Sequence, residues 1–445
     1  MIKGIVGRHA SKQFWALARR CHSSNRPDHS AMERKKRLYY PLLPDLPGKI
    51  RSPEGDIFFT DIPNDSQLVE AYALFQATVN KDDGFGVDDY PTLDYFIDYM
   101  CHDSIVPFVM YQKPEKKILG FFSTCPSRFC RGVNPVFCGG TTVFHDSMKD
   151  HGVYNQMADL YWEYAQHLGY EGYLGETFVN NKKVIHTLTE HQNFKILGEL
   201  PKISRLKHSG WVNSLAIVKL LREGKDEKPG YSVSKVIVPD PNISQITLNN
   251  HARKIDNLPR QCITHNGAQL SIDYVMEEDI EPIYDMFVKA QNEGDGFAID
   301  EYPTFNHFVY KLRRGHIFSI KVKGNIVGAM AVIPSRFVRS LYPILGDGPV
   351  IVDVQYRGNG NLIKLMRFHD SISKELGYVG SLRDTFATNY GHSTLSETGE
   401  RGSDRKSDSE VVARIPRTGY VAGKGWTDSY ITYKDFSDFK KASML

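Results

Sequence analysis

The chain has 445 residues, which is enough for two or three domains of ordinary size. Its hydrophobic content of 41%, charged content of 24% and formal net charge of +3 are typical of a globular protein. We therefore expect no nucleic-acid partner, and no apolar run approaches the roughly 20 residues that span a bilayer. The six cysteines lack zinc-ligand spacing, so we expect no metal.

Residues 1–27 differ from the rest of the chain. They are rich in basic residues and contain no acidic residue, because the first one is Asp28, and apolar side chains and serines are interspersed. This composition is typical of a mitochondrial transit peptide. We expect the protein to act in the mitochondrial matrix; a basic tail on a cytoplasmic protein is the alternative.

The remainder of the chain contains an internal repeat. The segment DGFGVDDYPT at 83–92 returns as DGFAIDEYPT at 295–304, and Pro-Ser-Arg-Phe at 126–129 returns at 334–337, a shift of 334 − 126 = 208 residues. The same shift relates further pairs: Gly120 and Gly328, Gly152 and Gly360, Thr177 and Thr385, and Asn181 and Asn389. A period this long indicates duplicated domains rather than a solenoid.

We predict one copy at 52–222, a linker at 223–266 and a second copy at 267–437. Each copy is expected to have the order β-α-α-β-β-β-α-β-α-β-β. In the second copy the pattern predicts strands at 270–275, 316–322, 326–333, 350–354, 378–386, 411–421 and 427–433, with helices at 280–291, 305–312 and 362–376. The fold class is therefore α+β, with two tandem domains that each contain a mixed, mostly antiparallel twisted sheet flanked by helices.

A glycine loop follows the predicted strand at 350–354 and precedes the helix at 362–376. It reads Gln-Tyr-Arg-Gly-Asn-Gly at 355–360. Small residues let backbone N–H groups point outward at the positive end of a helix, which suits a phosphate or pyrophosphate. Arg357 adds a fixed positive charge. On spacing alone the loop could equally be a tight turn, since it is neither a P-loop nor a dinucleotide fingerprint.

The element order, combined with this loop, resembles the GNAT superfamily of acyltransferases over nearly all of residues 52–437. The resemblance implies acetyl-CoA or another acyl-CoA as co-substrate. It implies the following donor-binding residues: Arg357, Gly358, Asn359 and Gly360 at the pyrophosphate, the backbone of Val352 and Val354 at the thioester and pantetheine, and the asparagine Asn389. Lys149, Gly152 and Asn181 hold the corresponding places in the first copy, where Asp150 adds an unfavourable negative charge, so we expect the second copy to be the better site.

The resemblance also implies a carboxylate base on the fourth or fifth strand. The candidates are Asp353 and Asp384 in the second copy and Glu176, with His145, in the first. Each could instead be an ordinary solvent-facing strand carboxylate. The tyrosine that usually protonates the thiol is replaced by Leu188 and Ser396 in the two copies, which leaves the general acid unassigned.

Two repeated motifs have an open interpretation. The carboxylates of the Asp-Gly-Phe segments could attract a cationic acceptor, or these segments could form a turn and a helix cap. Arg128 and Arg336, in the Pro-Ser-Arg-Phe motifs, could bind an anionic group or pair with a carboxylate of the chain.

We therefore expect an acyl-CoA-dependent N-acyltransferase that moves its acyl group directly to a primary amine of a small molecule or a protein. The alternatives are O-acylation or aminoacyl transfer, and a catalytically degenerate pair of domains that acts as a CoA sensor or scaffold. The expected partners are acyl-CoA and an amine acceptor. The chain is expected to be a monomer whose two copies could form an intramolecular pseudo-dimer.

Overall fold

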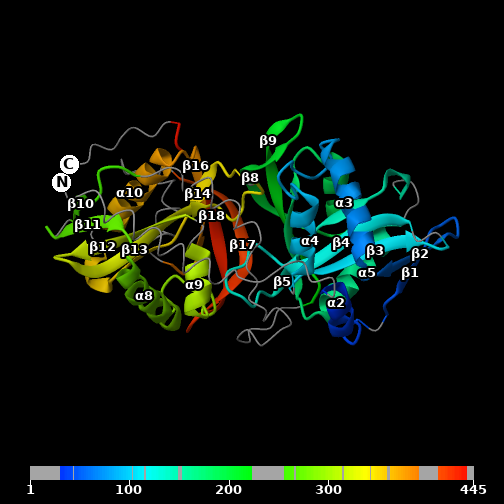
Figure 1. The fold of residues 1–445 in the computed structure, drawn as a ribbon, viewed down its shortest axis with the longest axis horizontal. Coiled ribbons are helices and arrows are strands. Elements are labelled where there is room, and N and C mark those ends of the chain that lie inside the picture. Colours follow the sequence, from blue (N-terminus) through cyan, green and yellow to red (C-terminus); the bar gives the residue numbers. More distant parts are fainter. Residues whose placement is uncertain are drawn as a thin grey trace. The chain divides into compact units, whose positions relative to one another are not determined.

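The computed structural model describes residues 31–437, with gaps at 44, 103, 115–116, 149–152, 223–254, 265–266, 313–314, 341, 358–360 and 390–408. The described residues form two compact units (Figure 1). The first unit contains the residues up to 222 together with Ala413–Tyr420, and the second contains residues 255–412 and 421–437. Within this described part, no helix is long and apolar enough to cross a membrane. The predicted transit segment at 1–27 lies outside it.

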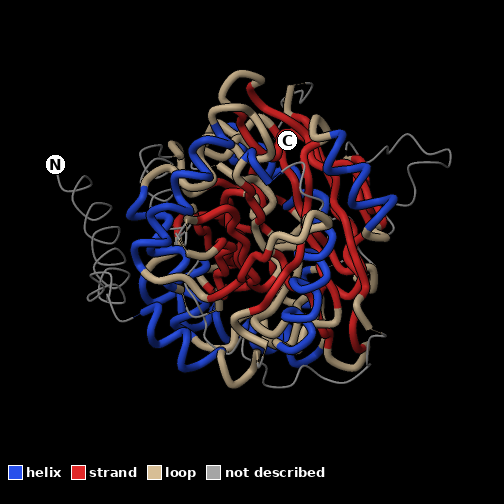
Figure 2. Tube along the Cα trace, turned by 90° about the vertical axis from the view of Figure 1, so that its right-hand side faces the viewer, coloured by secondary structure: helices blue, strands red, loops and turns tan. Residues whose placement is uncertain are grey.

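The first unit is a mixed sheet with helices on both faces (Figures 1 and 2). In chain order its elements are α2 (Ala31–Tyr39), β1 (Gly48–Arg51), β2 (Ile57–Asp61), α3 (Asp65–Val79), α4 (Leu93–Cys101), β3 (Val106–Gln112), β4 (Ile118–Pro126), β5 (Phe137–Gly139), β6 (Thr142–Phe144), η1 (Asp146–Met148), α5 (Tyr154–His167), β7 (Gly172–Phe178), α6 (Lys182–His186), η2 (Thr187–His191), β8 (Lys195–Leu206) and β9 (Gly210–Leu220).

The second unit has a similar succession of elements. They are β10 (Arg260–Ile263), β11 (Gln269–Tyr274), η4 (Glu277–Asp279), α8 (Ile280–Glu293), α9 (Phe305–Leu312), β12 (His316–Val322), β13 (Asn325–Pro334), β14 (Leu345–Asp347), β15 (Val350–Val352), η5 (Val354–Tyr356), α10 (Asn361–Glu375), β16 (Gly380–Phe386) and β18 (Gly425–Asp435), together with the two ends of β17 (Glu410–Val421), whose residues 413–420 belong to the first unit.

The sheet of each unit separates two apolar clusters. In the first unit Phe108 and Phe122 pack with α5, whereas their neighbours Val109 and Phe121 pack with α3 and α4. Successive strand residues point to opposite faces, so both faces of β3 and β4 are covered by helices and their sequences are continuously apolar. In the second unit α10 covers one face of β12 and β13, and α8 and α9 cover the other.

The strands pair in the same pattern in both units. An antiparallel ladder runs β1-β2-β3-β4 in the first unit and β10-β11-β12-β13 in the second. The next strand of each ladder is broken into two pieces. Its first piece, β5 or β14, pairs in parallel with β7 or β16. Those partners then pair antiparallel with β9 and β18.

The break produces a fork between two strands. In the second unit β14 pairs with β16 at Leu345↔Gly380 and Gly346↔Ser381, and β15 then continues along β13. Among the described residues, β15 has no pairing with β16. The chain turns at Gly348, which has φ +146° and whose Cβ position would be 1.8 Å from the carbonyl oxygen of Ala331, so only glycine fits. At the equivalent Gly140 of the first unit, whose φ is not positive, a Cβ would lie 1.9 Å from the carbonyl oxygen of Ser123, so glycine is required there for steric reasons alone.

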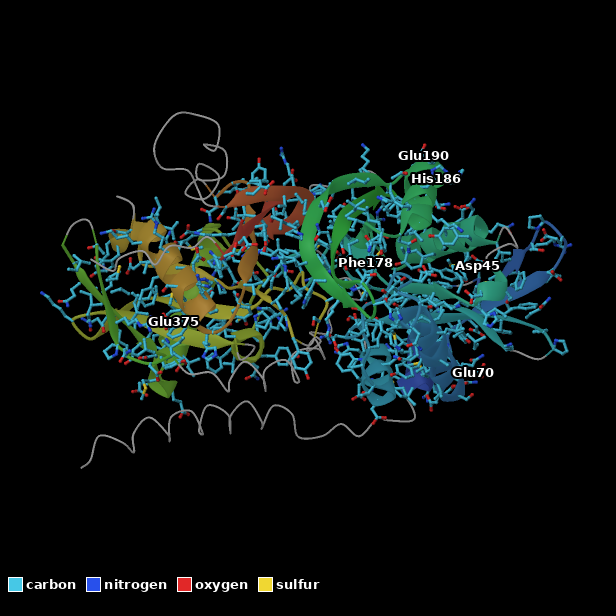
Figure 3. The ribbon with its side chains drawn as sticks, turned by 90° about the horizontal axis from the view of Figure 1, so that it is seen from above. Asp45, Glu70, Phe178, His186, Glu190 and Glu375 are labelled. Carbon is cyan, nitrogen blue, oxygen red and sulfur yellow. The ribbon has the colours of Figure 1, made fainter. Side chains whose placement is uncertain are left out.

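Some elements, β14 among them, were not anticipated from the sequence. Helix α2 and strand β1 precede the predicted first copy, and β10 lies inside the predicted linker. Arg260 of β10 forms two hydrogen bonds, of 2.8 and 2.7 Å, with the carboxylate of Glu375, labelled in Figure 3, and this ion pair fixes β10 to α10. The predicted strand at 350–354 is also too long, because it ends at Val352. Asp353 accepts from the Gln355 N–H and begins a 3₁₀ turn instead.

Candidate functional site

The fork in the second unit presents strand backbone that the sheet does not use. Pro349 accepts from the Ala331 N–H at 3.0 Å, and the Asp353 N–H donates to the Val327 carbonyl at 2.8 Å. Because backbone groups alternate along a strand, those of Val350 and Val352 point away from β13 and into the fork. The Val352 carbonyl accepts from the Arg357 Nε at 2.6 Å. The fork therefore offers an edge to which an extended chain could bind.

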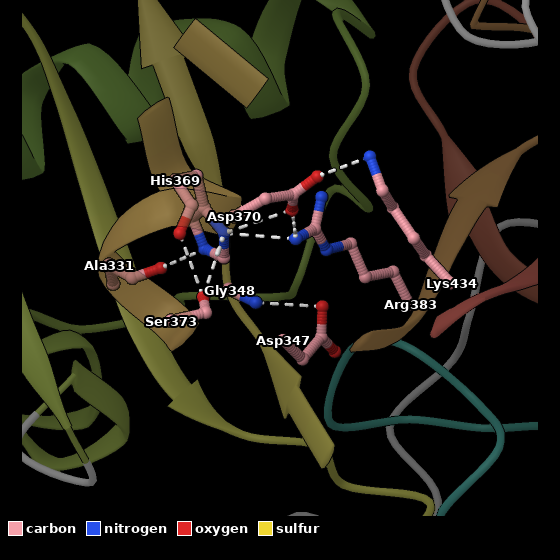
Figure 4. Close-up of polar contacts among 8 residues, drawn as sticks. All are labelled: Ala331, Asp347, Gly348, His369, Asp370, Ser373, Arg383 and Lys434. Carbon is pink, nitrogen blue, oxygen red and sulfur yellow. Dashed lines mark hydrogen bonds and ion pairs between the residues drawn. The ribbon is translucent and has the colours of Figure 1, made fainter. Parts of the chain in front are cut away.

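Asp347 lies at the point where the fork opens (Figure 4). Burial, together with the negative charge of Asp384, raises the pKa of its carboxyl to about 6, against the opposing effects of Arg336, the Gly348 N–H and Arg383. The Gly348 N–H donates to its Oδ1 at 2.7 Å. A carboxyl group that titrates near neutral pH beside an open strand edge is suited to proton transfer.

Sequence reasoning did not select Asp347. A signal for it was present, because the 208-residue shift aligns Asp347 with Gly139. The second copy therefore has a carboxylate at a position where the first copy has none. The motif Asp-Gly-Pro immediately before a buried β-branched run also indicated a strand interruption.

The two predicted carboxylate bases Asp384 and Glu176 form ion pairs with the arginines of the Pro-Ser-Arg-Phe motifs. Arg336 Nη2 lies 2.9 Å from Asp384 Oδ2, and Arg128 Nη2 lies 2.5 Å from Glu176 Oε1. Both carboxylate side chains are only 7% exposed. Each arginine thus neutralises a buried carboxylate, which supports the interpretation that the motif pairs with a carboxylate of the chain.

The serine of the same motif forms a hydrogen bond at the base of the fork, where the two strands separate. Ser335 Oγ donates to the Leu382 carbonyl at 2.6 Å, and Ser127 Oγ donates to the Leu174 carbonyl at 2.6 Å. Leu382 and Leu174 lie next to the last paired residues of β16 and β7, so the hydroxyl satisfies a carbonyl that the departing strand no longer reaches. The serine and the arginine of the motif therefore stabilise the sheet at the base of the fork.

Three further predicted residues of the second unit follow β15 in the chain, namely Asp353, Val354 and Arg357. Asp353 caps η5, so its carboxylate already has a structural task. Val354, assigned from the resemblance as a strand residue, instead lies in η5 and is 72% exposed. Arg357 bridges two segments, since its guanidinium bonds both the Val352 carbonyl and the carboxylate of Asp295. Gly358, Asn359 and Gly360, like Lys149 and Gly152 in the first unit, lie outside the described residues.

The Asp-Gly-Phe segments form turns and helix caps. The Gly86 N–H donates to Asp89 Oδ2 at 2.9 Å, and the Ala298 N–H donates to Glu301 Oε2 at 3.1 Å. The hydroxyls of the two repeated threonines cap α4 and α9, and the two repeated tyrosines are buried in aromatic clusters. These contacts favour the structural interpretation for most of the segment.

One part of that segment lies against the predicted asparagine in both units. A Cβ on Gly84 would lie 3.4 Å from Asn181 Nδ2, and a Cβ on Gly296 would lie 3.0 Å from Asn389 Nδ2. In the first unit this contact borders a pocket of about 220 Å³. The pocket is lined by Lys81, Asp82, Asp83, Gly84, Phe178, Asn180 and Asn181, of which Phe178 is labelled in Figure 3.

The fork of the first unit is filled by aromatic side chains. Tyr161 of α5 donates to the Gly139 carbonyl at 3.1 Å, and Tyr173 of β7 donates to the Gly140 carbonyl at 3.4 Å. The ring of Tyr173 lies over Gly175, where a Cβ would be 2.6 Å from it, and also contacts Trp162. At the 208-residue shift, Tyr161, Tyr173 and Trp162 correspond to His369, Ser381 and Asp370, and Gly175 corresponds to Arg383, so polar and charged side chains replace the aromatic ones in the second unit.

No metal-binding cluster is formed by the described residues, because their His, Cys, Asp and Glu side chains nowhere gather in a suitable group of three. No protein-family model matches the chain, and no curated protein does.

Solved structures of N-acetyltransferases are similar to part of the chain. A GCN5-related N-acetyltransferase from Kribbella flavida is 14% identical, covers 37% of this chain and 97% of its own, and has a TM-score of 0.33. A spermidine N-acetyltransferase from Vibrio cholerae in complex with CoA and spermine is 12% identical over 37% of this chain and 94% of its own, with a TM-score of 0.29. A ribosomal-protein-alanine N-acetyltransferase from Brucella melitensis is 16% identical over 37% and 98%, with a TM-score of 0.30. The bound ligands and activities belong to those proteins.

Proposed function

We propose that the second unit is an acyl-CoA-dependent N-acyltransferase of the GNAT type, which transfers an acyl group directly to a primary amine. The observation that carries this proposal is the position of Asp347, a carboxyl group with a pKa of about 6 at the opening of the strand fork. The open edge of β15 supplies a binding site for the donor, and Asp347 supplies a base for the acceptor.

The fork suits the chemistry of the donor. Pantetheine is an extended chain with two amide groups, and such a chain can bind an exposed strand edge by main-chain hydrogen bonds. The backbone groups of Val350 and Val352 point into the fork, as described above. The segment 357–360 precedes α10, so Arg357 and the amino end of this helix would lie where the pyrophosphate of CoA needs positive charge.

The acceptor ammonium loses two protons in the reaction. Above pH 6 Asp347 is mostly ionised and can take the first, which leaves a nucleophilic amine. The amine nitrogen attacks the thioester carbonyl carbon, the C–N bond forms, the nitrogen releases its second proton to solvent, and the C–S bond then breaks. The CoA thiolate leaves, and solvent or the Asp347 carboxyl supplies the proton that gives the free thiol. Any backbone N–H directed at the developing oxyanion would lower the barrier.

The first unit is proposed to be non-catalytic. Gly139 replaces Asp347, and Tyr161 and Tyr173 donate to the two carbonyls at the turn of its fork. The aromatic side chains occupy the space that a pantetheine chain would need. This unit would therefore support the second one rather than bind a donor of its own.

Isothermal titration calorimetry with acetyl-CoA and longer acyl-CoAs, followed by measurement of thiol release with a panel of amines, tests the proposal. We expect one donor site per chain and thiol release that depends on the amine. Donor binding without turnover on any amine would favour a CoA sensor, and transfer to hydroxyl acceptors would favour O-acylation. Absence of donor binding would refute the proposal.

Two charge reversals locate the donor site. Arg357→Glu should abolish acyl-CoA binding because it places a negative charge beside the pyrophosphate, whereas Lys149→Glu should leave most of the binding intact. If the two results are reversed, the donor site is in the first unit.

A further inference from the structure

A buried polar cluster in the second unit connects α10 to the fork (Figure 4). His369 of α10 is fully buried, and its neighbour Asp370 bonds the guanidinium of Arg383 on β16 and, at 3.0 Å, the Lys434 ammonium on β18. Asp347 lies on the other side of this cluster, at the end of β14. Charged and polar side chains of this kind are seldom buried in a protein interior, so the reason for their burial here has to be found.

The hydrogen bonds of His369 determine its tautomer. Arg383 Nη2 lies 3.0 Å from His369 Nδ1, and Ser373 Oγ lies 3.3 Å from the same nitrogen. A guanidinium can only donate, so Nδ1 must be the acceptor and carries no proton. The neutral ring therefore carries its proton on Nε2, which donates to the Ala331 carbonyl at 2.8 Å.

The same surroundings keep the ring neutral. Burial, together with the positive charge of Arg383, lowers the pKa of His369 to about 3, while Asp370 and the hydrogen bonds to the backbone of Ala331 and Asp347 act in the opposite direction. His369 thus remains an uncharged donor over the whole range in which the Asp347 carboxyl titrates.

The Nε2–H donor is directed at the turn that positions Asp347. The Ala331 carbonyl lies against the Cα of Gly348, and a Cβ on Gly348 would be 3.2 Å from His369 Nε2. The Ala331 N–H in turn donates to the Pro349 carbonyl. The imidazole therefore braces the backbone on which Asp347 is carried, from the face opposite α8 and α9.

The first unit contains a matched brace. Tyr161 stands 208 residues before His369, on α5, and its hydroxyl donates to the Gly139 carbonyl at 3.1 Å. A Cβ on Gly140 would lie 2.7 Å from that hydroxyl. A helix side chain with one N–H or O–H donor thus occupies the same place in both units. The arrangement in the second unit differs because it fixes the donor with Arg383 and places a carboxylate on the braced turn.

We propose that His369 is a positioning residue, whose Nε2–H donor braces the glycine turn and thereby holds Asp347 at the mouth of the fork. The catalytic significance of this brace rests on the proposed function. The groups that face His369 are Asp370 and Ser373 on its own helix, Arg383 on β16 and Asp347 on β14, with Lys434 on β18 reaching Asp370.

The first test needs no substrate and observes the wild-type ring directly. Nitrogen-15 NMR of the full chain, with the His369 resonance identified from its loss in His369→Tyr, should show a neutral ring protonated on Nε2 that does not titrate between pH 5 and pH 8. A ring that becomes charged in this range, or that carries its proton on Nδ1, would overturn the proposal.

The second test compares His369→Tyr, which introduces the donor used by the first unit, with His369→Phe, which removes the donor. Carbon-13 NMR of aspartate-labelled protein follows the Asp347 carboxyl, identified from its loss in Asp347→Asn. We expect a raised pKa in the wild type and His369→Tyr. In His369→Phe the loosened turn admits water, and the pKa should move down toward the ordinary aspartate range. An unchanged pKa in His369→Phe contradicts the proposal.

Kinetics complete the comparison. In His369→Phe the kcat should fall at least tenfold with the KM for acyl-CoA unchanged, and the acidic limb of the pH profile should move to lower pH, whereas His369→Tyr should retain most of the activity. If the wild type transfers no acyl group, the proposed function fails, but the two NMR experiments still decide whether His369 braces Asp347.

Discussion

Asp347 is the residue on which the chemical interpretation depends. Its folded-state pKa of about 6 lies above the ordinary value of 3.8, because the carboxylate form loses hydration in the fork. Between about pH 4 and pH 6 the folded chain therefore binds more protons than the unfolded chain, and its stability falls as the pH rises. Above pH 6 the Asp347 carboxylate is charged in both the folded and the unfolded chain, so the free energy of unfolding stays lowered by the full cost of its lost hydration.

Replacement of Asp347 by asparagine should consequently stabilise the second unit while it removes activity. At pH 7.5 we expect a gain on the order of 3 kcal/mol in the free energy of unfolding, because the folded-state pKa of about 6 exceeds 3.8 and each unit of difference corresponds to about 1.4 kcal/mol. Below pH 4 the gain should vanish, because wild-type Asp347 is then neutral in both states. Thermal unfolding at pH 7.5 and pH 4 measures the difference. A variant that is less stable than the wild type at pH 7.5 would contradict this assignment.

Asp384 and Arg336 are expected to act as a structural pair. Removal of the arginine alone in Arg336→Met leaves a buried carboxylate uncompensated and should cost about 2 kcal/mol of stability, since Arg336 is partly exposed. The double variant Arg336→Met/Asp384→Leu should recover much of this loss. A thermal-unfolding double-mutant cycle measures the coupling, and the equivalent cycle at Arg128 and Glu176 is the matched control. Strictly additive effects in both cycles would argue against the pairing.

At the scale of elements, the fork could be predicted only in part. Helix α9 and strand β12 have the bounds that the sequence predicted, because each is a short periodic segment set off by clear signals, proline near the start of α9 and the turn after β12. Strand β14 was missed because three residues, one of them glycine, give no periodic signal. Its existence depends on pairing with β16, and that contact is absent from local sequence.

The same dependence on contacts distant in the sequence explains which site residues were predicted and which were missed. The sequence pattern selected Asp384 and Glu176 because they lie on the fifth strand, but it could not show that an arginine 48 residues earlier would neutralise each of them. Asp347 escaped notice because its environment arises from three separate segments, namely β14, the Pro-Ser-Arg-Phe loop and β16. Val354 was misassigned because a β-branched run continues beyond the residue at which Asp353 caps a turn.

Filling the second fork as the first one is filled should block the donor. The variant Ser381→Tyr/Arg383→Gly reproduces Tyr173 and Gly175, and the ring should occupy the pantetheine space. We expect acyl-CoA to bind at least tenfold more weakly by calorimetry. Arg383→Gly alone is the control for lost charge and should bind the donor more tightly than the double variant. Equal binding by the two variants would show that the fork is not the donor site.

At the scale of the whole molecule, the two units have the same strand pairing but different forks. One has aromatic side chains and a glycine where the other has charges and Asp347. The serine hydrogen bond and the arginine ion pair are the same in both units. The different residues of the two forks therefore affect chemistry rather than folding. We propose that the chain retains one catalytic unit and one supporting unit.

The composition of residues 1–27 leads to a prediction about location. A fluorescent protein that carries residues 1–27 at its amino terminus should accumulate in mitochondria, since a basic amphipathic segment is drawn toward the negatively charged matrix. A variant with Arg19 and Arg20 changed to glutamate should remain in the cytoplasm. Cytoplasmic fluorescence from both fusions would leave the segment as a basic tail.

The central claim is that Asp347 is the base of an acyl-transfer site in the second unit. The pH dependence of kcat/KM for amine-dependent thiol release, measured for the wild type, Asp347→Asn and Glu176→Gln, tests it most directly. We predict an acidic limb near pH 6 in the wild type and in Glu176→Gln, and a loss of about a hundredfold or more in Asp347→Asn. An unchanged profile in Asp347→Asn, or a loss confined to Glu176→Gln, would contradict the claim.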